Sequence, residues 1–157
     1  MSSAAGKMPR FPQLTLDQLS EAQKPLGAQV MKVSSVGIGG PYNVLLRSPL
    51  MARRMYDLLD YLRWHTSVPT RLNEFAILIQ ARLWRSQVEW FAHYPLALKA
   101  GLSEAVAADL KANLRPRAMQ LDESAVYDFC MALSTQHEVS DEVFGRARQV
   151  LQRAADH

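Results

Sequence analysis

Apolar side chains recur at helical spacing along most of the chain. Residues 50–65 carry them three and four positions apart, at Met51, Met55, Leu58, Leu59 and Leu62. This interval places them on one face of a helix, and we expect that face to lie in the core. Residues 70–100 contain the stretch FAILIQARLW, which is apolar nearly all round. The pattern therefore predicts a central helix or helix pair there.

Capping residues and further apolar stripes predict four more helices. A short one covers residues 15–26, with Pro25 near its end. The others cover residues 103–115, 122–136 and 140–155. Gly101 is placed to end the preceding helix, and Ser103 is a good N-cap for the next one. Because no alternating strand and no internal repeat is found, we expect an all-α protein, a compact bundle of about six helices.

Two stretches depart from the helical pattern. The opening sequence MSSAAGKMPRFPQ is rich in Ser, Ala and Pro and has no apolar run of the secretory type, so residues 1–13 are expected to be a flexible tail. Residues 33–49 contain several glycines and prolines, which predict an extended or looped connection that could cover a pocket. The remaining residues 14–157 are expected to form a single helical domain.

Composition and charge narrow the class of protein. The 157 residues are 48% hydrophobic and 21% charged, which is enough apolar material for one core. The net charge of +3 is spread along the chain, so no nucleic-acid partner is expected. Charged residues interrupt every apolar run before the ~20 residues that span a membrane, so no membrane partner is expected. The single cysteine, Cys130, excludes an intrachain disulfide and a cysteine-built metal site, and it fits a cytoplasmic location.

Ser86, Glu89 and His93 form the pattern that most suggests chemistry. They are three and four residues apart, so on one helix their side chains share a face. A carboxylate and an imidazole one turn apart suit proton transfer, because the carboxylate can fix the tautomer of the ring or take a proton itself. The same Glu–His pair can also serve only to stabilise its helix, by roughly 0.2–0.5 kcal/mol.

Glu74 is a further acidic candidate in the same segment. It precedes Glu89 by 15 residues, which on one unbroken helix would separate the two by roughly 22 Å. The two could act together only if the chain turned back near residues 84–86, and nothing in ARLWRSQVEW forces such a turn. Glu74 could equally be a first-turn acid that complements the helix dipole.

One long segment resembles a known family. The run NEFAILIQARLWRSQVEWFAHYPLALKAGLSEAVAADLKAN is similar to the core of the carboxymuconolactone decarboxylase and alkyl hydroperoxidase D-like family. There an acidic residue opens an apolar helix, and a Cys-x-x-Cys-x-x-x-His motif or a Glu-Trp-x-x-His variant precedes an Ala-rich segment ending in Gly-Leu-Ser. The segments GPYNVLLRSP, LDESAVYDF and VSDEVF also resemble family segments, so the resemblance covers residues 40–144.

The resemblance implies an alkyl hydroperoxidase D-like helical fold, a homo-oligomer and a set of site residues. The acidic residue corresponds to Glu74 and the histidine to His93. The two cysteine positions are occupied by Ser86 and Glu89. Because neither serine nor glutamate can form a disulfide, a thiol peroxidase cycle is not available at this motif.

What the resemblance implies instead is a carboxymuconolactone decarboxylase-like lyase or isomerase. Its substrate would be a small anionic molecule, an acidic lactone or aromatic breakdown product, and it would need no metal or organic cofactor. His93 would move the proton, Glu89 would orient or share it, and Glu74 would polarise a water or the substrate. Substrate binders are expected at Ser86 and, in the resembling loop, at Tyr42, Asn43 and Arg47.

Two other functions stay open. One is an antioxidant relative of alkyl hydroperoxidase D, against which the missing cysteines argue. The other is a catalytically silent oligomeric binding protein of the same fold, favoured because family members of this type usually continue into further helices where this sequence ends in RQVLQRAADH. An enzyme requires Glu74 and His93 to converge in a pocket, whereas a silent protein predicts that they lie apart, covered or in bulk water.

Overall fold

The computed structural model describes residues 10–34 and 36–155, and the chain divides into two compact units, Met1–Asp60 and Tyr61–His157. Most of the predicted tail, residues 1–9, lies outside the described residues. Gln13, which we expected at the end of that tail, donates a hydrogen bond of 3.2 Å to the carbonyl of Ile38. The single domain predicted for residues 14–157 stays a prediction.

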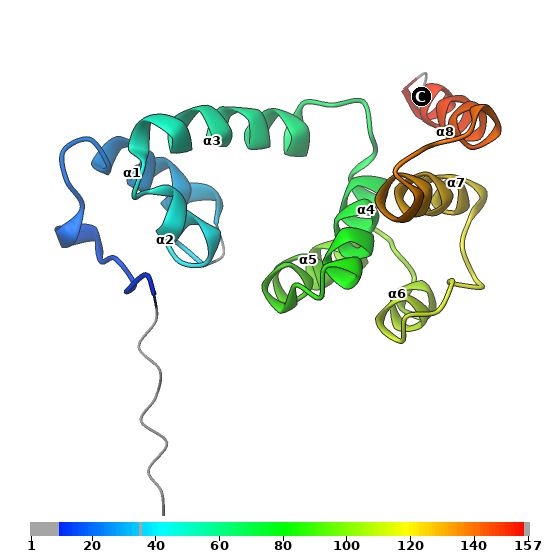
Figure 1. Ribbon diagram of the computed structural model, residues 1–157, viewed down its shortest axis with the longest axis horizontal. Coiled ribbons are helices and arrows are strands. Elements are labelled where there is room, and N and C mark those ends of the chain that lie inside the picture. Colours follow the sequence, from blue (N-terminus) through cyan, green and yellow to red (C-terminus); the bar gives the residue numbers. More distant parts are fainter. Residues whose placement is uncertain (1–9, 35, 156–157) are drawn as a thin grey trace, which may run out of the picture. The chain divides into compact units, whose positions relative to one another are not determined.

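Every regular element in the described part of the chain is helical, and no strand occurs there, which confirms the all-α prediction. Residues 10–34 and 36–155 contain eight α-helices, where the sequence predicted about six (Figure 1). One extra helix arises because residues 70–100 form two helices. The other is the short α2 (Pro41–Leu45) within the predicted connection, which begins at a proline because that residue is tolerated in a first helical turn.

The helix predicted for residues 15–26 is wrong. In its place are a single 3₁₀ turn, Leu16–Gln18, and α1 (Lys24–Val33). Pro25, which we expected near the helix end, lies in the first turn of α1. The N–H groups of a first turn have no partner within the helix, so the missing N–H of proline removes no hydrogen bond there.

The first unit has a small apolar core. Its buried side chains are Leu19, Leu26, Val30, Ile38, Leu46 and Ala52. The helix α3 (Pro49–Trp64) contributes only Ala52 to this core. The α3 face that we expected to be buried is exposed, at Met51, Met55, Leu58, Leu59 and Leu62, so that prediction is wrong. Periodicity identifies residues that share a face, but it contains no information on whether another element covers the face.

The second unit is built around α4 (Thr70–Leu83), which packs against both α5 and α7 (Figure 1). Its other helices are α5 (Gln87–Lys99), α6 (Glu104–Lys111), α7 (Leu121–Met131) and α8 (Asp141–Ala155). The core contains Leu72, Phe75, Leu78, Ile79, Ala97, Leu102, Val106, Ala107, Leu110, Val126 and Tyr127. Because four of these residues belong to α4, the predicted central position of this segment is confirmed.

Three successive helices of the second unit end in the same way. A residue with positive φ follows the C-cap of α4, α5 and α6: Arg85 (53°), Gly101 (100°) and Asn113 (62°). The backbone N–H groups of Gly101 and Leu102 donate to carbonyls in the last turn of α5, the pair of bonds that defines a Schellman motif. Gly101 therefore ends its helix as predicted, and Ser103 is the N-cap of α6 as predicted.

Gly101→Ala is expected to lower the free energy of unfolding by about 1–2 kcal/mol, because a residue with a Cβ is strained at this positive φ. The added Cβ would meet only Cδ of Arg71, at an ordinary 3.7 Å, so the effect is conformational rather than steric. Gly145 lies inside α8, where an added Cβ would meet no atom within 4 Å. Gly145→Ala is therefore expected to stabilise by about 0.5–1 kcal/mol. Urea denaturation measures both values, and effects of the same sign would contradict this account.

Candidate functional site

A tight turn between α4 and α5 brings the main predicted residues together. The chain leaves α4 through Arg85, whose positive φ reverses its direction. The N–H of Ser86 then donates back to the carbonyl of Ala81 over 2.8 Å. The sequence predicted that Glu74 and Glu89 could act together only if the chain turned back near residues 84–86, and this turn is present.

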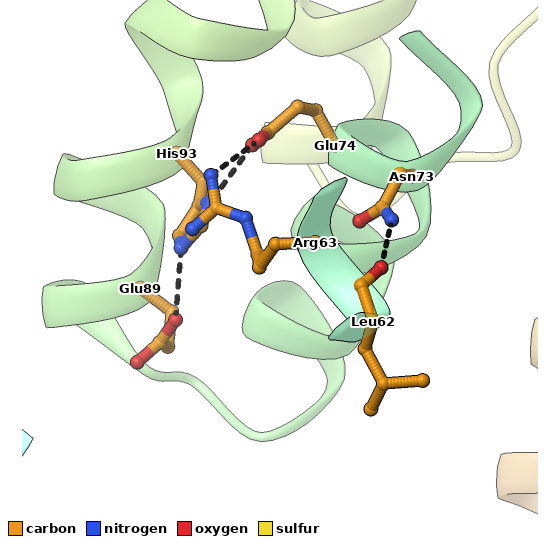
Figure 2. A network of polar contacts seen from close by, with 6 residues as sticks. All are labelled: Leu62, Arg63, Asn73, Glu74, Glu89 and His93. Carbon is orange, nitrogen blue, oxygen red and sulfur yellow. Dashed lines mark hydrogen bonds and ion pairs between the residues drawn. The ribbon is translucent and has the colours of Figure 1, made fainter. Parts of the chain in front are cut away.

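Glu74 is the buried centre of the site (Figure 2). Only 2% of its surface is exposed, and both carboxylate oxygens have partners. Oε2 lies 2.7 Å from Nδ1 of His93, and Oε1 accepts a hydrogen bond of 2.9 Å from Nη2 of Arg63. A buried carboxylate is costly unless it is paired and hydrogen bonded, and these two partners supply that compensation. Glu74 lies beyond the first turn of α4, so its interpretation as a first-turn acid is wrong.

His93 connects the buried carboxylate to the surface. It is 9% exposed and lies on α5 one turn after Glu89. Its Nε2 is 3.4 Å from Oε2 of Glu89, close enough for an ion pair when the ring is protonated. The side chain of Glu89 is 43% exposed. Each ring nitrogen of His93 therefore faces a carboxylate, one buried and the other open to solvent.

Ser86 and Glu89 fix the start of α5. The hydroxyl oxygen of Ser86 accepts a bond of 3.4 Å from the backbone N–H of Glu89, which makes Ser86 the N-cap. A glutamate at this third helical position often reaches back to the N–H of the N-cap residue. Here that N–H is bonded to Ala81 instead, and the Glu89 carboxylate faces His93. The substrate-binding role of Ser86 stays a prediction.

Arg63 is a site residue that the sequence analysis missed. It lies in the last turn of α3, and its guanidinium carbon is 4.9 Å from the ring centroid of Trp64. Nearby, Nδ2 of Asn73 donates to the carbonyl of Leu62 over 2.9 Å, which ties the end of α3 to α4 (Figure 2). The only signal in the sequence was a basic residue in a last helical turn, which is common because it complements the helix dipole.

The three other predicted substrate binders lie in the first unit. Asn43 is buried, and its Oδ1 accepts a hydrogen bond of 2.9 Å from the N–H of Leu14. Nη2 of Arg47 donates to the carbonyl of Pro12, and Tyr42 packs against the apolar core of the unit. These contacts give all three residues a role in the structure of their own unit. Their role in substrate binding stays a prediction.

The described residues contain neither a grouped metal site nor a membrane-spanning helix. In the described part of the chain, no three His, Cys, Asp or Glu side chains are grouped as a metal site would require. No helix within residues 10–34 and 36–155 is long and apolar enough to cross a membrane.

The family of the chain is not identified by comparison with known proteins. No family model, curated protein or solved structure matches this chain. The family resemblance seen in the sequence therefore stays a prediction.

Proposed function

We propose that this chain is an acid–base enzyme, a carboxymuconolactone decarboxylase-like lyase or isomerase of the alkyl hydroperoxidase D-like fold. Its substrate is a small anionic molecule, an acidic lactone or aromatic breakdown product. The observation that carries the proposal is the placement of His93 between two carboxylates, with Nδ1 2.7 Å from the buried Glu74 and Nε2 near the exposed Glu89. A histidine that transfers a proton needs such an orienting partner on one nitrogen and access to the substrate at the other.

The two carboxylates have different roles in this proposal. Glu74 accepts the hydrogen on Nδ1 and so selects the tautomer in which Nε2 has a lone pair. The Arg63 guanidinium balances the negative charge of Glu74 where water is excluded. Glu89 exchanges protons between Nε2 and solvent. The sequence led us to expect another division of roles, in which Glu89 orients or shares the proton and Glu74 polarises a water or the substrate.

The proposed reaction balances with one proton taken from water. The bond between the substrate carboxylate and its carbon breaks, carbon dioxide leaves, and the electron pair moves into the ring as its double bond shifts. Protonated His93 then delivers a proton from Nε2 to the carbon that has become electron-rich, and Glu89 restores that proton from solvent. Proton transfer by a positioned side chain contributes about 10²–10⁴ in rate.

A thiol peroxidase gains no support from the site. The one cysteine, Cys130, lies on α7 and lines a separate apolar pocket. Burial raises the pKa of its thiol to about 11, so the reactive thiolate is scarce near neutral pH. The chemistry that we propose is therefore proton transfer at His93.

Turnover of a panel of carboxylactones and organic hydroperoxides tests the proposal, with carbon dioxide release and peroxide loss followed together. We expect carbon dioxide release by the wild type and its loss in His93→Asn. The matched control is His137→Asn, at an exposed residue whose φ of 60° an asparagine tolerates. Equal carbon dioxide release by the two variants would refute the role of His93, and peroxide loss without carbon dioxide release would refute the reaction class.

A further inference from the structure

An apolar pocket in the second unit has no role in the chemistry proposed above. It lies between α4, α7 and α8 and has a volume of about 470 Å³, within the roughly 300–1,000 Å³ of small-molecule sites. The apolar residues around it include Leu72, Ala76, Val126, Phe129, Phe144 and Leu151. Phe144 is 52% exposed, so an aromatic ring stands at the pocket edge.

The pocket and the Glu74 site lie on different faces of α4. Leu72 and Ala76 line the pocket, and Glu74 lies midway between them in the sequence. Two residues along a helix correspond to a rotation of about 200°, so the Glu74 side chain points away from the pocket. A ligand in the pocket would therefore leave the Glu74 site unoccupied.

Arg148 gives the pocket a positive edge. Apart from Cys130, the polar lining residues are Ser67, Arg148 and Gln152, and no acidic residue lines the pocket. Arg148 forms no ion pair within the described residues, whereas Arg146 on the same helix pairs with Asp128. Arg148 and Gln152 are one turn apart on α8, so both side chains can reach the same group of a ligand.

We propose that this pocket binds an amphipathic monoanion, a small molecule with an aliphatic or aryl body and a carboxylate. The body occupies the apolar volume, where its removal from water is favourable. The carboxylate lies at Arg148 and Gln152, because a guanidinium binds a carboxylate through two parallel hydrogen bonds. The inference depends on the pocket alone and is independent of the reaction proposed for His93.

Calorimetric titration with decanoate and with decanol tests this proposal, because the two probes share a chain and differ in charge. We expect decanoate to bind saturably at one site, and to bind about ten- to hundredfold more weakly to Arg148→Gln. The same substitution should leave decanol binding unchanged. Lys111→Gln removes one positive charge from an exposed position on α6 and is the matched control, with unchanged affinity for decanoate.

Cys130 reports occupancy of the pocket independently. It lines the pocket and is the only cysteine, so decanoate is expected to slow its alkylation by iodoacetamide. Ala76→Phe fills the pocket and should abolish binding of both probes, with circular dichroism as the check on folding. Arg148 is exposed, so Arg148→Gln is expected to fold. This variant therefore tests the contact with the carboxylate even if Ala76→Phe does not fold.

Three results would overturn the inference. The first is decanoate binding that is equally strong in Arg148→Gln and the wild type, and the second is alkylation of Cys130 that decanoate does not slow. The third is a dimer in which neither probe binds, which would show that a second copy of the chain covers the pocket.

Discussion

Arg71→Met is expected to lower the free energy of unfolding by about 3–5 kcal/mol, because it leaves a buried carboxylate without its partner. Arg71, in the first turn of α4, pairs with Glu123 and, over 2.6 Å, with Asp122. Glu123 is only 1% exposed, and its second oxygen accepts the N–H of Gln120 over 2.8 Å. The network joins the starts of α4 and α7, and urea denaturation of the variant measures its contribution.

A double variant and a surface control separate the buried charge from the loss of packing. Arg71→Met combined with Glu123→Leu removes both partners, so it should recover most of the stability lost by Arg71→Met alone. Arg115→Met breaks a pair with Asp128 in which the arginine side chain is 52% exposed, and is expected to lower stability by less than ~1 kcal/mol. If Arg71→Met and Arg115→Met had equal effects, the buried network would not be a main source of stability.

Glu74→Gln is expected to lower kcat by about 10²–10⁴, the range for loss of a positioned acid–base group. Arg63 can only donate hydrogen bonds, so it should hold the amide oxygen of the new glutamine. The amide nitrogen would then donate a hydrogen bond to Nδ1 of His93. Because Nδ1 accepts this bond, the proton of the neutral ring would lie on Nε2. Because Nδ1 would then face an N–H donor instead of a carboxylate, the doubly protonated ring that delivers the proton to the substrate would be disfavoured.

Steady-state kinetics on the substrate identified by the panel measure this effect. Because Glu74 does not touch substrate in the proposal, KM should change much less than kcat. Glu104→Gln, at an exposed position in the first turn of α6, is the control and should retain full activity. A kcat for Glu74→Gln within about twofold of the wild type would remove Glu74 from the mechanism.

Much of the second unit was predictable from local patterns. Its helices have apolar stripes long enough to be recognised, and their ends have residues of strong positional preference, such as Gly101 and Ser103. The first unit was predicted less well, because its elements are short and Pro25 marks the start of a helix rather than its end. The exposed face of α3 was mispredicted because burial depends on other elements, which periodicity alone does not reveal.

The site could be predicted only in part, for two physical reasons. The spacing of Glu89 and His93 places them one turn apart on any helix, so their proximity followed from the sequence. The turn that brings Glu74 to them depends on Arg85 at a positive φ, a position that glycine usually occupies, so no residue type signalled it. The pairing of Arg63 with Glu74 is a tertiary contact between consecutive helices, and no sequence spacing encodes it.

The position of the ring proton on His93 tests the central claim of this account most directly. Long-range ¹H–¹⁵N correlation spectra of the histidine rings, recorded where His93 is neutral, report it without knowledge of the substrate. We predict a proton on Nδ1, donated to Glu74, in the wild type, and a proton on Nε2 in Glu74→Gln. A wild-type ring protonated on Nε2, or a tautomer that Glu74→Gln does not change, would contradict the claim that Glu74 orients His93 for proton transfer.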